Sequence, residues 1–520
     1  MSRRPSVMVH QFSQVPRAEI PRSTFDRSHG YKTAFDAGLL IPFFIDEALP
    51  GDTFNLRVSA LARLATPIYP IMDNMFMDTH FFSVPCRLVW DNWQRFNGEQ
   101  KNPTDSTDFT IPKIDMSALS TGFAENSVFD YLGIPTKVPN LTVNALPLRA
   151  INLIWNEWFR DQNLQPSLPV NTGDGPDTPA DYNLYRRGKR HDYFTSCLPW
   201  PQKGPGVTIP LGTEAKIATK ALTGGDISIR DNTNTQRLMP TNAENLTLGS
   251  TIGNAQSYMY ADLTSATAAT INSLRQAFQI QKIYERDARG GTRYIELLKS
   301  HFGVTSPDAR LQRPEYLGGG STPVIINPIA QTSPTGTYAN TPQGNLAGFG
   351  TAALNGHGFS SSFTEHCYII GFVSVRADLT YQQGLNRLWS RQTRFDYYWP
   401  ALAHIGEQSV LQREIYATGV TVDDEKVFGY QERFAEYRYK PSQITGILRS
   451  SATTSLDAWH LSQEFATAPV LGPEFIAEQP PVDRIIAVPT EPHFIMDSYF
   501  QLKCARPMPV YSVPGLIDHF

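Results

Sequence analysis

The chain has 520 residues and a formal net charge of −4, and only 18% of its residues are charged. This balance excludes a protein that coats nucleic acid over its whole surface, because neutralising phosphates requires a clear excess of Lys and Arg. The 39 prolines, 36 glycines and 11% aromatic residues favour a β-rich fold with many turns over a helical one.

The N-terminal segment is basic and interrupted by prolines. Its first 32 residues contain two acidic side chains, Glu19 and Asp26, and prolines at positions 5, 16 and 21. Proline fixes the backbone and removes a hydrogen-bond donor, so we expect residues 1–52 to form an N-terminal arm and an extended segment. The basic residues of this segment are Arg3, Arg4, Arg17, Arg22, Arg27 and Lys32.

The first clear strand follows this segment. Apolar and polar side chains alternate from Phe54 to Ala60, which is the period of a half-buried strand. Long stretches of sequence separate the later strand-like runs, a spacing typical of a β-sandwich with large insertions. We therefore predict an all-β fold. The later runs are residues 79–84, 324–329, 368–375, 427–439 and 494–503.

The insertions are predicted to contain the helices and the exposed loops. Helical periodicity is confined to residues 148–159 and 295–302. Residues 205–255 are rich in Thr, Asn and Gly, a composition that buries little area, so we expect an exposed surface insertion within one domain spanning residues 1–520. Residues 317–362 contain Gly318 to Gly320 and repeated prolines, which predicts a long surface loop.

No catalytic or metal-binding motif is present in the sequence. Gly188-Lys189 is followed by Arg190, where a P-loop requires Ser or Thr. The glycine runs lack the third glycine of a dinucleotide-binding turn, and no histidine or serine lies in a hydrolase motif. The four cysteines are far apart, which predicts buried free thiols. We expect no metal and no cofactor.

Targeting signals are also missing from the sequence. No apolar segment follows the charged residues at the N-terminus, and the longest apolar runs fall far short of the roughly 20 residues that a transmembrane helix needs. We therefore expect synthesis in a reducing cytoplasm.

Two runs combine cations with aromatic side chains, at residues 185–193 and 387–399. Proteins hold single-stranded nucleic acid in this way, with a positive groove for the backbone and aromatic faces for the bases. Arginine and tyrosine are also favoured at protein interfaces, so subunit packing or a place in the core is the alternative. The candidate DNA-binding residues in these runs are Arg186, Arg187, Lys189, Arg190, Arg387, Arg391 and Arg394.

Long phrases of the chain resemble one known family. They include FDRSHGYKTAFDAGLLIPFFIDEALPGDTFN at residues 25–55 and HFFSVPCRLVWDNWQRFN at residues 80–97. The chain is similar at these phrases to the major capsid proteins of the Microviridae, and in particular to those of the gokushoviruses. The similarity continues through residues 158–165, 192–204, 285–317, 380–408 and 506–520.

The resemblance implies a fold and a function. It implies an eight-stranded antiparallel viral jelly roll with large loop and helical insertions, and a structural protein that is not an enzyme. Sixty copies would self-assemble into a T=1 icosahedral shell around a circular single-stranded DNA genome. The protein would be located in the virion and be assembled in the cytoplasm of the host bacterium.

The resemblance also implies partners. They are other copies of the chain, the genome, a small basic DNA-binding protein, other virion proteins and the surface of the host. The arginines at positions 3, 4 and 17 would face the genome, and residues 205–255 would form a protrusion at the threefold axes. Candidate host contacts are Thr223, Asp231, Asn232 and Asn234.

A carbohydrate-binding or carbohydrate-active jelly-roll protein is the alternative from another class. Such a protein would also be aromatic, rich in loops and nearly neutral. It would normally have a signal peptide or a converging pair of carboxylates, and the sequence indicates neither.

Overall fold

The computed structural model describes residues 21–114, 121–207, 271–291, 293–304, 312–332 and 344–511, together with the backbone of short strands between residues 216 and 262. The chain divides into two compact units. The first comprises Met1–Trp200 and Val304–Phe520, and the second comprises Pro201–Gly303.

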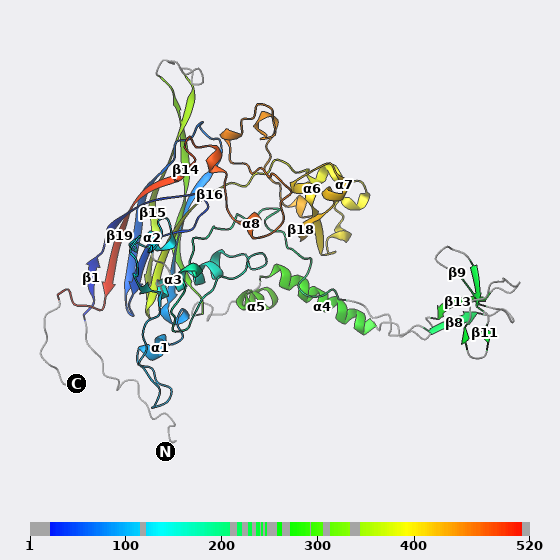
Figure 1. Ribbon diagram of the computed structural model, residues 1–520, viewed down its shortest axis with the longest axis horizontal. Coiled ribbons are helices and arrows are strands. Elements are labelled where there is room, and N and C mark those ends of the chain that lie inside the picture. The colour runs from blue at the N-terminus through cyan, green and yellow to red at the C-terminus, as the bar shows by residue number, and fades with distance from the viewer. Residues whose placement is uncertain are drawn as a thin grey trace, which may run out of the picture. The chain divides into compact units, whose positions relative to one another are not determined.

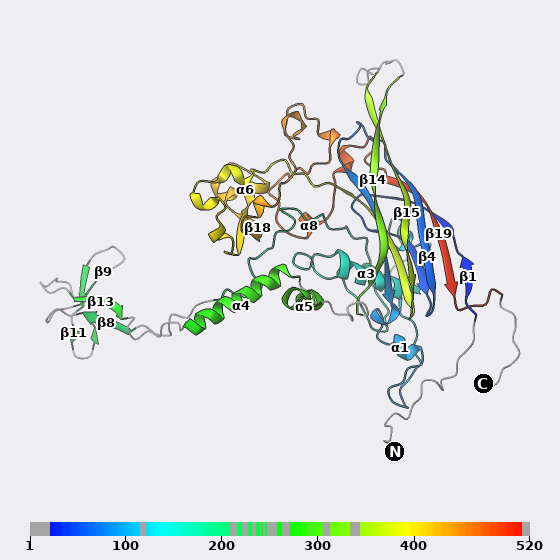
Figure 2. The ribbon, with the colours of Figure 1, turned by 180° about the vertical axis from the view of Figure 1, so that it is seen from behind.

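The first unit is built on antiparallel strands that form a curled sheet (Figures 1 and 2). Its hydrogen-bonded order is β1-β19-β4-β15-β14-β5-β16-β3, and β2 also pairs with β19. The strands are β1 (Ser23–Asp26), β2 (His29–Phe35), β3 (Ile41–Ala48), β4 (Thr53–Leu64), β5 (Met75–Pro85), β14 (Glu315–Ala330), β15 (Leu346–Ser362), β16 (Cys367–Ala377) and β19 (Phe494–Arg506).

Strand β14 joins two groups of strands within this sheet. It pairs with β5 as far as Val324 and with β15 from Ile325 onward. One group is therefore β2-β19-β4-β15 and the other is β3-β16-β5-β14, and all these pairs are antiparallel. The predicted all-β jelly roll is confirmed. The sheet has nine strands where eight were expected, because β1 and β2 pair with successive parts of β19.

Side-chain periodicity explains why these segments form strands. In β4 and β19, buried and more exposed side chains alternate, so one face of each strand packs into the sandwich. Every residue of β16 is buried. One face of β16, with Ile369 and Val373, packs in the sandwich core, and the other, with Ile370 and Phe372, packs in a second apolar core. Burial on both faces explains its nearly continuous apolar sequence.

The second core lies against short helices and irregular chain. Its main helix is α3, and a π-helical turn at Trp155–Phe159 continues it, so the predicted helical run at 148–159 is confirmed. The elements in this part are α1 (Trp93–Phe96), β6 (Lys113–Ile114), α2 (Val128–Tyr131), β7 (Val143–Asn144) and α3 (Leu146–Ile154).

The predicted surface loop at residues 317–362 is wrong. Residues 317–330 and 346–362 of this segment lie in strands β14 and β15, and residues 333–343 lie outside the described residues. Its glycines allow the strands to approach closely. A Cβ at Gly319 would lie 2.0 Å from the carbonyl oxygen of Thr79, and one at Gly318 would lie 2.5 Å from that of Gly358. These glycines therefore mark strand contacts and not a turn.

Residues 23–48, which belong to the predicted N-terminal arm and extended segment, contain three strands of the sheet. Residues 1–20, with the arginines at positions 3, 4 and 17, lie outside the described residues. The strand expected at 427–439 ends at Glu432, because Phe434 adopts a left-handed conformation with φ 63° and a 3₁₀ turn follows.

Residues 379–476 form a small lobe of short elements within the first unit, drawn in yellow and orange (Figure 1). Its apolar core includes Val410, Ile415 and Phe428, together with Tyr193 and Phe194 from an earlier segment. Its elements are β17 (Glu407–Leu411), α6 (Gln412–Ile415), α7 (Thr421–Asp424), β18 (Val427–Glu432) and α8 (Pro473–Ile476).

The second unit contains the predicted insertion and extends beyond it to Gly303. The expected helical run at 295–302 is confirmed as α5. The predicted host-contact residues at positions 223, 231, 232 and 234 lie outside the described residues. The elements are β8 (Lys216–Lys220), β9 (Ile227–Arg230), β10 (Gln236–Met239), β11 (Thr241–Asn242), β12 (Asn245–Leu246), β13 (Ser257–Asp262), α4 (Ile271–Arg289) and α5 (Tyr294–Phe302).

Candidate nucleic-acid interface

The second cation–aromatic run lies on the small lobe, in two 3₁₀ turns at Arg387–Ser390 and Arg394–Asp396. The side chain of Asn386 accepts a hydrogen bond from the N–H of Leu388 at 3.0 Å and starts the first turn. In the second turn, the carboxylate of Asp396 accepts hydrogen bonds from both the N–H and the hydroxyl of Thr393. Local side-chain hydrogen bonds of this kind favour turns over longer helices.

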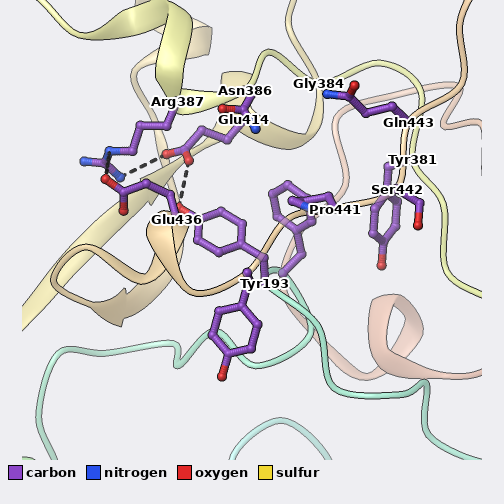
Figure 3. A pocket seen from close by; sticks show the side chains of 12 residues that line it. Tyr193, Tyr381, Gly384, Asn386, Arg387, Glu414, Glu436, Pro441, Ser442 and Gln443 are labelled. Carbon is purple, nitrogen blue, oxygen red and sulfur yellow. Dashed lines mark hydrogen bonds and ion pairs between the residues drawn. The ribbon is translucent and has the colours of Figure 1, made fainter. Parts of the chain in front are cut away.

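Arg387 is held by carboxylates from distant parts of the lobe. Its guanidinium lies 3.2 Å from Glu414 and 4.0 Å from Glu436, and it donates a hydrogen bond to the carbonyl of Ser409 at 2.9 Å. Figure 3 shows these side chains converging beside a cleft. The charge of Arg387 is therefore largely neutralised inside the protein.

Glu414 connects the two cation–aromatic runs. The hydroxyl of Tyr193, which ends the first run, donates a hydrogen bond to Glu414 at 2.8 Å (Figure 3). Burial raises the pKa of Glu414, against the opposing effects of Arg387 and this hydrogen bond. Burial also raises the pKa of Tyr193, so the phenol stays protonated and remains a donor. The arrangement is a buried polar bridge.

A cleft of about 60 Å³ lies beside this bridge. One water needs roughly 10–15 Å³, so the cleft holds a few waters or part of a flat group. Its lining combines aromatic faces with amide and hydroxyl groups: Tyr193, Phe194, Tyr381, Gly384, Asn386, Arg387, Glu414, Glu436, Tyr439, Pro441, Ser442 and Gln443 (Figure 3).

Arg391 is also committed to internal partners. It lies 3.4 Å from Glu436 and donates a hydrogen bond to the hydroxyl of Tyr437 at 2.7 Å. Its guanidinium also stacks over the ring of Tyr437 at 4.4 Å and that of Tyr397 at 5.2 Å. Its positive charge is thus offset, and its stem helps to pack the surface aromatic residues.

Arg394 differs from the other two arginines because its side chain is exposed. Its guanidinium lies over the rings of Phe395 at 5.1 Å and Trp399 at 5.6 Å. No ion pair of Arg394 is found within the described part of the chain. We use the name arginine–aromatic surface for Arg394 together with the exposed rings of residues 389–399 and of Tyr437, which contacts Arg391. The rings are those of Trp389, Phe395, Tyr397, Tyr398, Trp399 and Tyr437.

The first run is mostly engaged inside the fold. Arg186 donates to the carbonyls of Ala37 and Glu478, at 3.2 and 3.3 Å. Arg187 forms an ion pair with the buried Asp78. These contacts within the subunit favour a structural role over DNA binding for both arginines.

Lys189 and Arg190 differ in exposure. Lys189 is buried, donates to the side chain of Gln463 at 2.8 Å and lies 4.4 Å from the ring of Phe475. Burial lowers its pKa to about 8. Arg190 keeps a half-exposed side chain, although Asp378 lies 3.2 Å away. Among the four cations of this run, Arg190 is the one best placed to reach an external phosphate.

Sequence reasoning did not identify Glu414, Glu436 or Tyr437. They complete the site from positions far along the chain, and no spacing rule links them to the arginines. The only local signal was the density of arginines and aromatic rings between 387 and 399.

Three expectations about chemistry and targeting can be compared with the described residues. All four cysteines are buried and free, as predicted. Within the described ranges, no group of three His, Cys, Asp or Glu side chains could hold a metal ion. None of the described helices is long and apolar enough to cross a membrane.

Comparison with known proteins gives matches along nearly the whole chain. The sequence profile of a family described as "Capsid protein (F protein)" matches residues 13–516. The chain is 50% identical to the capsid protein VP1 of Bdellovibrio phage phiMH2K and 45% identical to that of Chlamydia phage 1. It is 39% identical to the capsid protein VP1 of Spiroplasma virus 4. Each match covers 98% of both chains.

Proposed function

Because the chain belongs to the phage capsid protein (F protein) family, we propose that sixty copies form a T=1 icosahedral shell around a circular single-stranded DNA genome. The resemblance to Microviridae capsid proteins is confirmed. The protein is a structural major capsid protein and not an enzyme, it self-assembles into a shell, and it is a component of the virion. The carbohydrate-binding alternative is therefore set aside.

The arginine–aromatic surface supports a contact with the genome. Trp389 is 74% exposed, and the neighbouring rings also present large faces to solvent. Large apolar patches on a soluble protein indicate a surface that another molecule covers. Arg394 supplies a cation beside the rings, which is the combination that holds single-stranded DNA. The genome is thus our preferred occupant, and a neighbouring subunit is the alternative.

The net charge limits what this chain contributes to packaging. Because each copy has a net charge of −4, a shell cannot neutralise its genome by bulk charge. We propose that counterions and a small basic DNA-binding protein supply most of the compensation. The N-terminal arginines at positions 3, 4 and 17 would face the interior and add local contacts.

The inserted segment at residues 205–255 would face outward. Its neutral composition of Thr, Asn and Gly suits a solvated protrusion. We propose that it clusters around the threefold axes and contacts the bacterial surface, with Thr223, Asp231, Asn232 and Asn234 as candidate contacts. Assembly would take place in the host cytoplasm.

Assembly is tested by expressing the full chain and imaging it by negative-stain electron microscopy. Shells, or pentamers and rings on the way to shells, are the expected result. Particles of uniform size with icosahedral outlines would support the sixty-copy shell. A chain that remains monomeric over a wide range of concentration and salt would contradict the proposal.

The DNA contact is tested by titrating salt against the binding of a single-stranded oligonucleotide. The Arg394→Ala variant should lower the slope of log affinity against log salt by roughly 0.7–1, the effect of losing one phosphate contact. The matched control is Arg95→Ala, which removes an exposed arginine of α1 outside the small lobe. Equal slopes for Arg394→Ala and the unmodified chain would rule out Arg394 as a phosphate contact.

A further inference from the structure

The paired ends of β14 and β15 form a two-stranded hairpin that extends beyond the neighbouring strands (Figures 1 and 2). The pairing of β14 with β5 ends at Val324, and the pairing of β15 with β4 begins at Thr351. We use the name arm for residues 325–330 and 346–351, which pair with one another. The edge of β14 in the arm has no strand partner among the described residues.

One face of the arm is apolar except for Asn327. Side chains two residues apart point to the same face of a strand, so Ile325 and Ile329 share a face. The register places Ile329 opposite Ala347 and Asn327 opposite Phe349, so these residues also contribute to it. Ile325 is 58% exposed and Ile329 is 51% exposed. We call this set the arm face.

The arm's own sequence is free of charge over a long stretch, and the cation beside the arm face is Arg63 of β4, whose guanidinium lies over the ring of Phe349 at 5.1 Å. From Tyr316 to Thr364 the chain contains no Lys, Arg, Asp or Glu, although 18% of all residues are charged. Exposed edge strands are usually protected by charged side chains that prevent contact with other chains. The arm lacks this protection, so its exposed face is built to be covered.

The chemistry of the arm limits what can cover it. DNA is disfavoured, because the arm itself offers no cation to a phosphate and the single guanidinium of Arg63 beside it lies over the ring of Phe349. The cores of protein interfaces are apolar and depleted of charge, which is the composition of the arm face. A subunit of a shell is surrounded by other copies of the same chain. Each of these copies carries the same uncharged arm, so a second copy is the partner that best fits the arm face. Pro328 supplies no N–H on this edge, so side-chain packing is favoured over addition of a complete strand.

We propose that the arm face docks against a second copy of this chain in the assembled shell. The inference rests on the proposed function, because it requires shells to form. It goes further by assigning one subunit contact to Ile325, Ile329, Ala347 and Phe349. The contact would bury two exposed isoleucines from each participating arm.

The first test introduces charge on the arm face of the full chain. The double variant Ile325→Lys, Ile329→Lys should give at least about tenfold fewer shells, because two cations would have to be desolvated in an apolar contact. The conservative variant Ile325→Val, Ile329→Val should assemble normally. Normal assembly of the lysine variant would overturn the inference, while failure of the unmodified chain to assemble would overturn the proposed function as well.

A second measurement covers the case in which the lysine variant fails to fold. The four native cysteines are buried, so an Ile329→Cys variant carries one exposed thiol among the described residues. Maleimide should modify that thiol more slowly in intact shells than in dissociated subunits, by roughly tenfold or more if the contact is stable. Equal rates in shells and subunits would show that the arm face is uncovered and would overturn the inference.

Discussion

The jelly-roll sandwich and the small lobe are stabilised in different ways. In the sandwich, apolar side chains from many strands meet, and the ring of Phe500 lies 5.3 Å from Phe43 and 5.1 Å from Phe44. In the small lobe, a smaller apolar core around Phe428 is supplemented by polar bridges between short elements, such as that of Arg387 to Glu414. Apolar burial is spread over many contacts, whereas a polar bridge depends on two partners. Substitutions in the two regions should therefore have different costs.

The largest effect is expected in the sandwich. Phe500→Ala removes a fully buried ring and should lower the free energy of unfolding by about 3–5 kcal/mol. The control is Tyr499→Ala, because Tyr499 is half exposed and points to the opposite face of β19. Its cost should be clearly smaller. Urea unfolding of dissociated subunits measures both, and equal costs would contradict the role assigned to the sandwich core.

The next effect concerns the junction between the two regions. Glu478 is 1% exposed and accepts a hydrogen bond from the N–H of Ala377, the last residue of β16. Burial raises its pKa from 4.5 to about 7. The folded chain therefore holds this proton after the unfolded chain has released it. Between these two pKa values, stability should fall as pH rises, by up to roughly 3 kcal/mol.

The variant Glu478→Gln should remove most of this pH dependence, because the amide stays neutral at every pH. It should be at least as stable as the unmodified chain above pH ~7, where the buried carboxylate is charged. Glu474→Gln is the control, because Glu474 lies exposed in α8. The free energies of unfolding of both variants are measured between pH 4.5 and about 7. If Glu478→Gln keeps the pH dependence of the unmodified chain, Glu478 is not the group that causes it.

A smaller effect is expected at the polar bridge of the small lobe. Arg387→Met leaves the buried carboxylate of Glu414 without its cation, and we expect a loss of about 1–3 kcal/mol because the guanidinium is partly exposed. Adding Glu414→Gln should recover part of the loss, since no unpaired charge then remains. A double-mutant cycle by urea unfolding measures this coupling. Strictly additive losses would mean that the two side chains do not act as a bridge.

The difference between apolar burial in the sandwich and polar bridges in the small lobe also explains which features the sequence could predict. Alternation from Phe54 to Ala60 predicted β4, because burial of one sheet face leaves a period of two in the sequence. Gly318 to Gly320 was misinterpreted as a loop, because a glycine needed for close strand contact has the same composition as one needed for a turn. The bridge through Glu414 could not be predicted, since it joins residues that only the folded chain brings together.

The smallest effect on stability is expected at Trp389. A variant at this position can therefore test whether the genome or a second subunit covers the arginine–aromatic surface. Because this ring is 74% exposed, Trp389→Ala should change the free energy of unfolding by less than about 0.5 kcal/mol. If a base stacks on the ring, the variant should bind single-stranded oligonucleotide more weakly by about 1–3 kcal/mol and still assemble. If the ring instead packs against a neighbouring subunit, shell yield should fall while oligonucleotide affinity stays the same. Measuring both properties on one variant therefore separates the genome from a second subunit as the occupant of this surface.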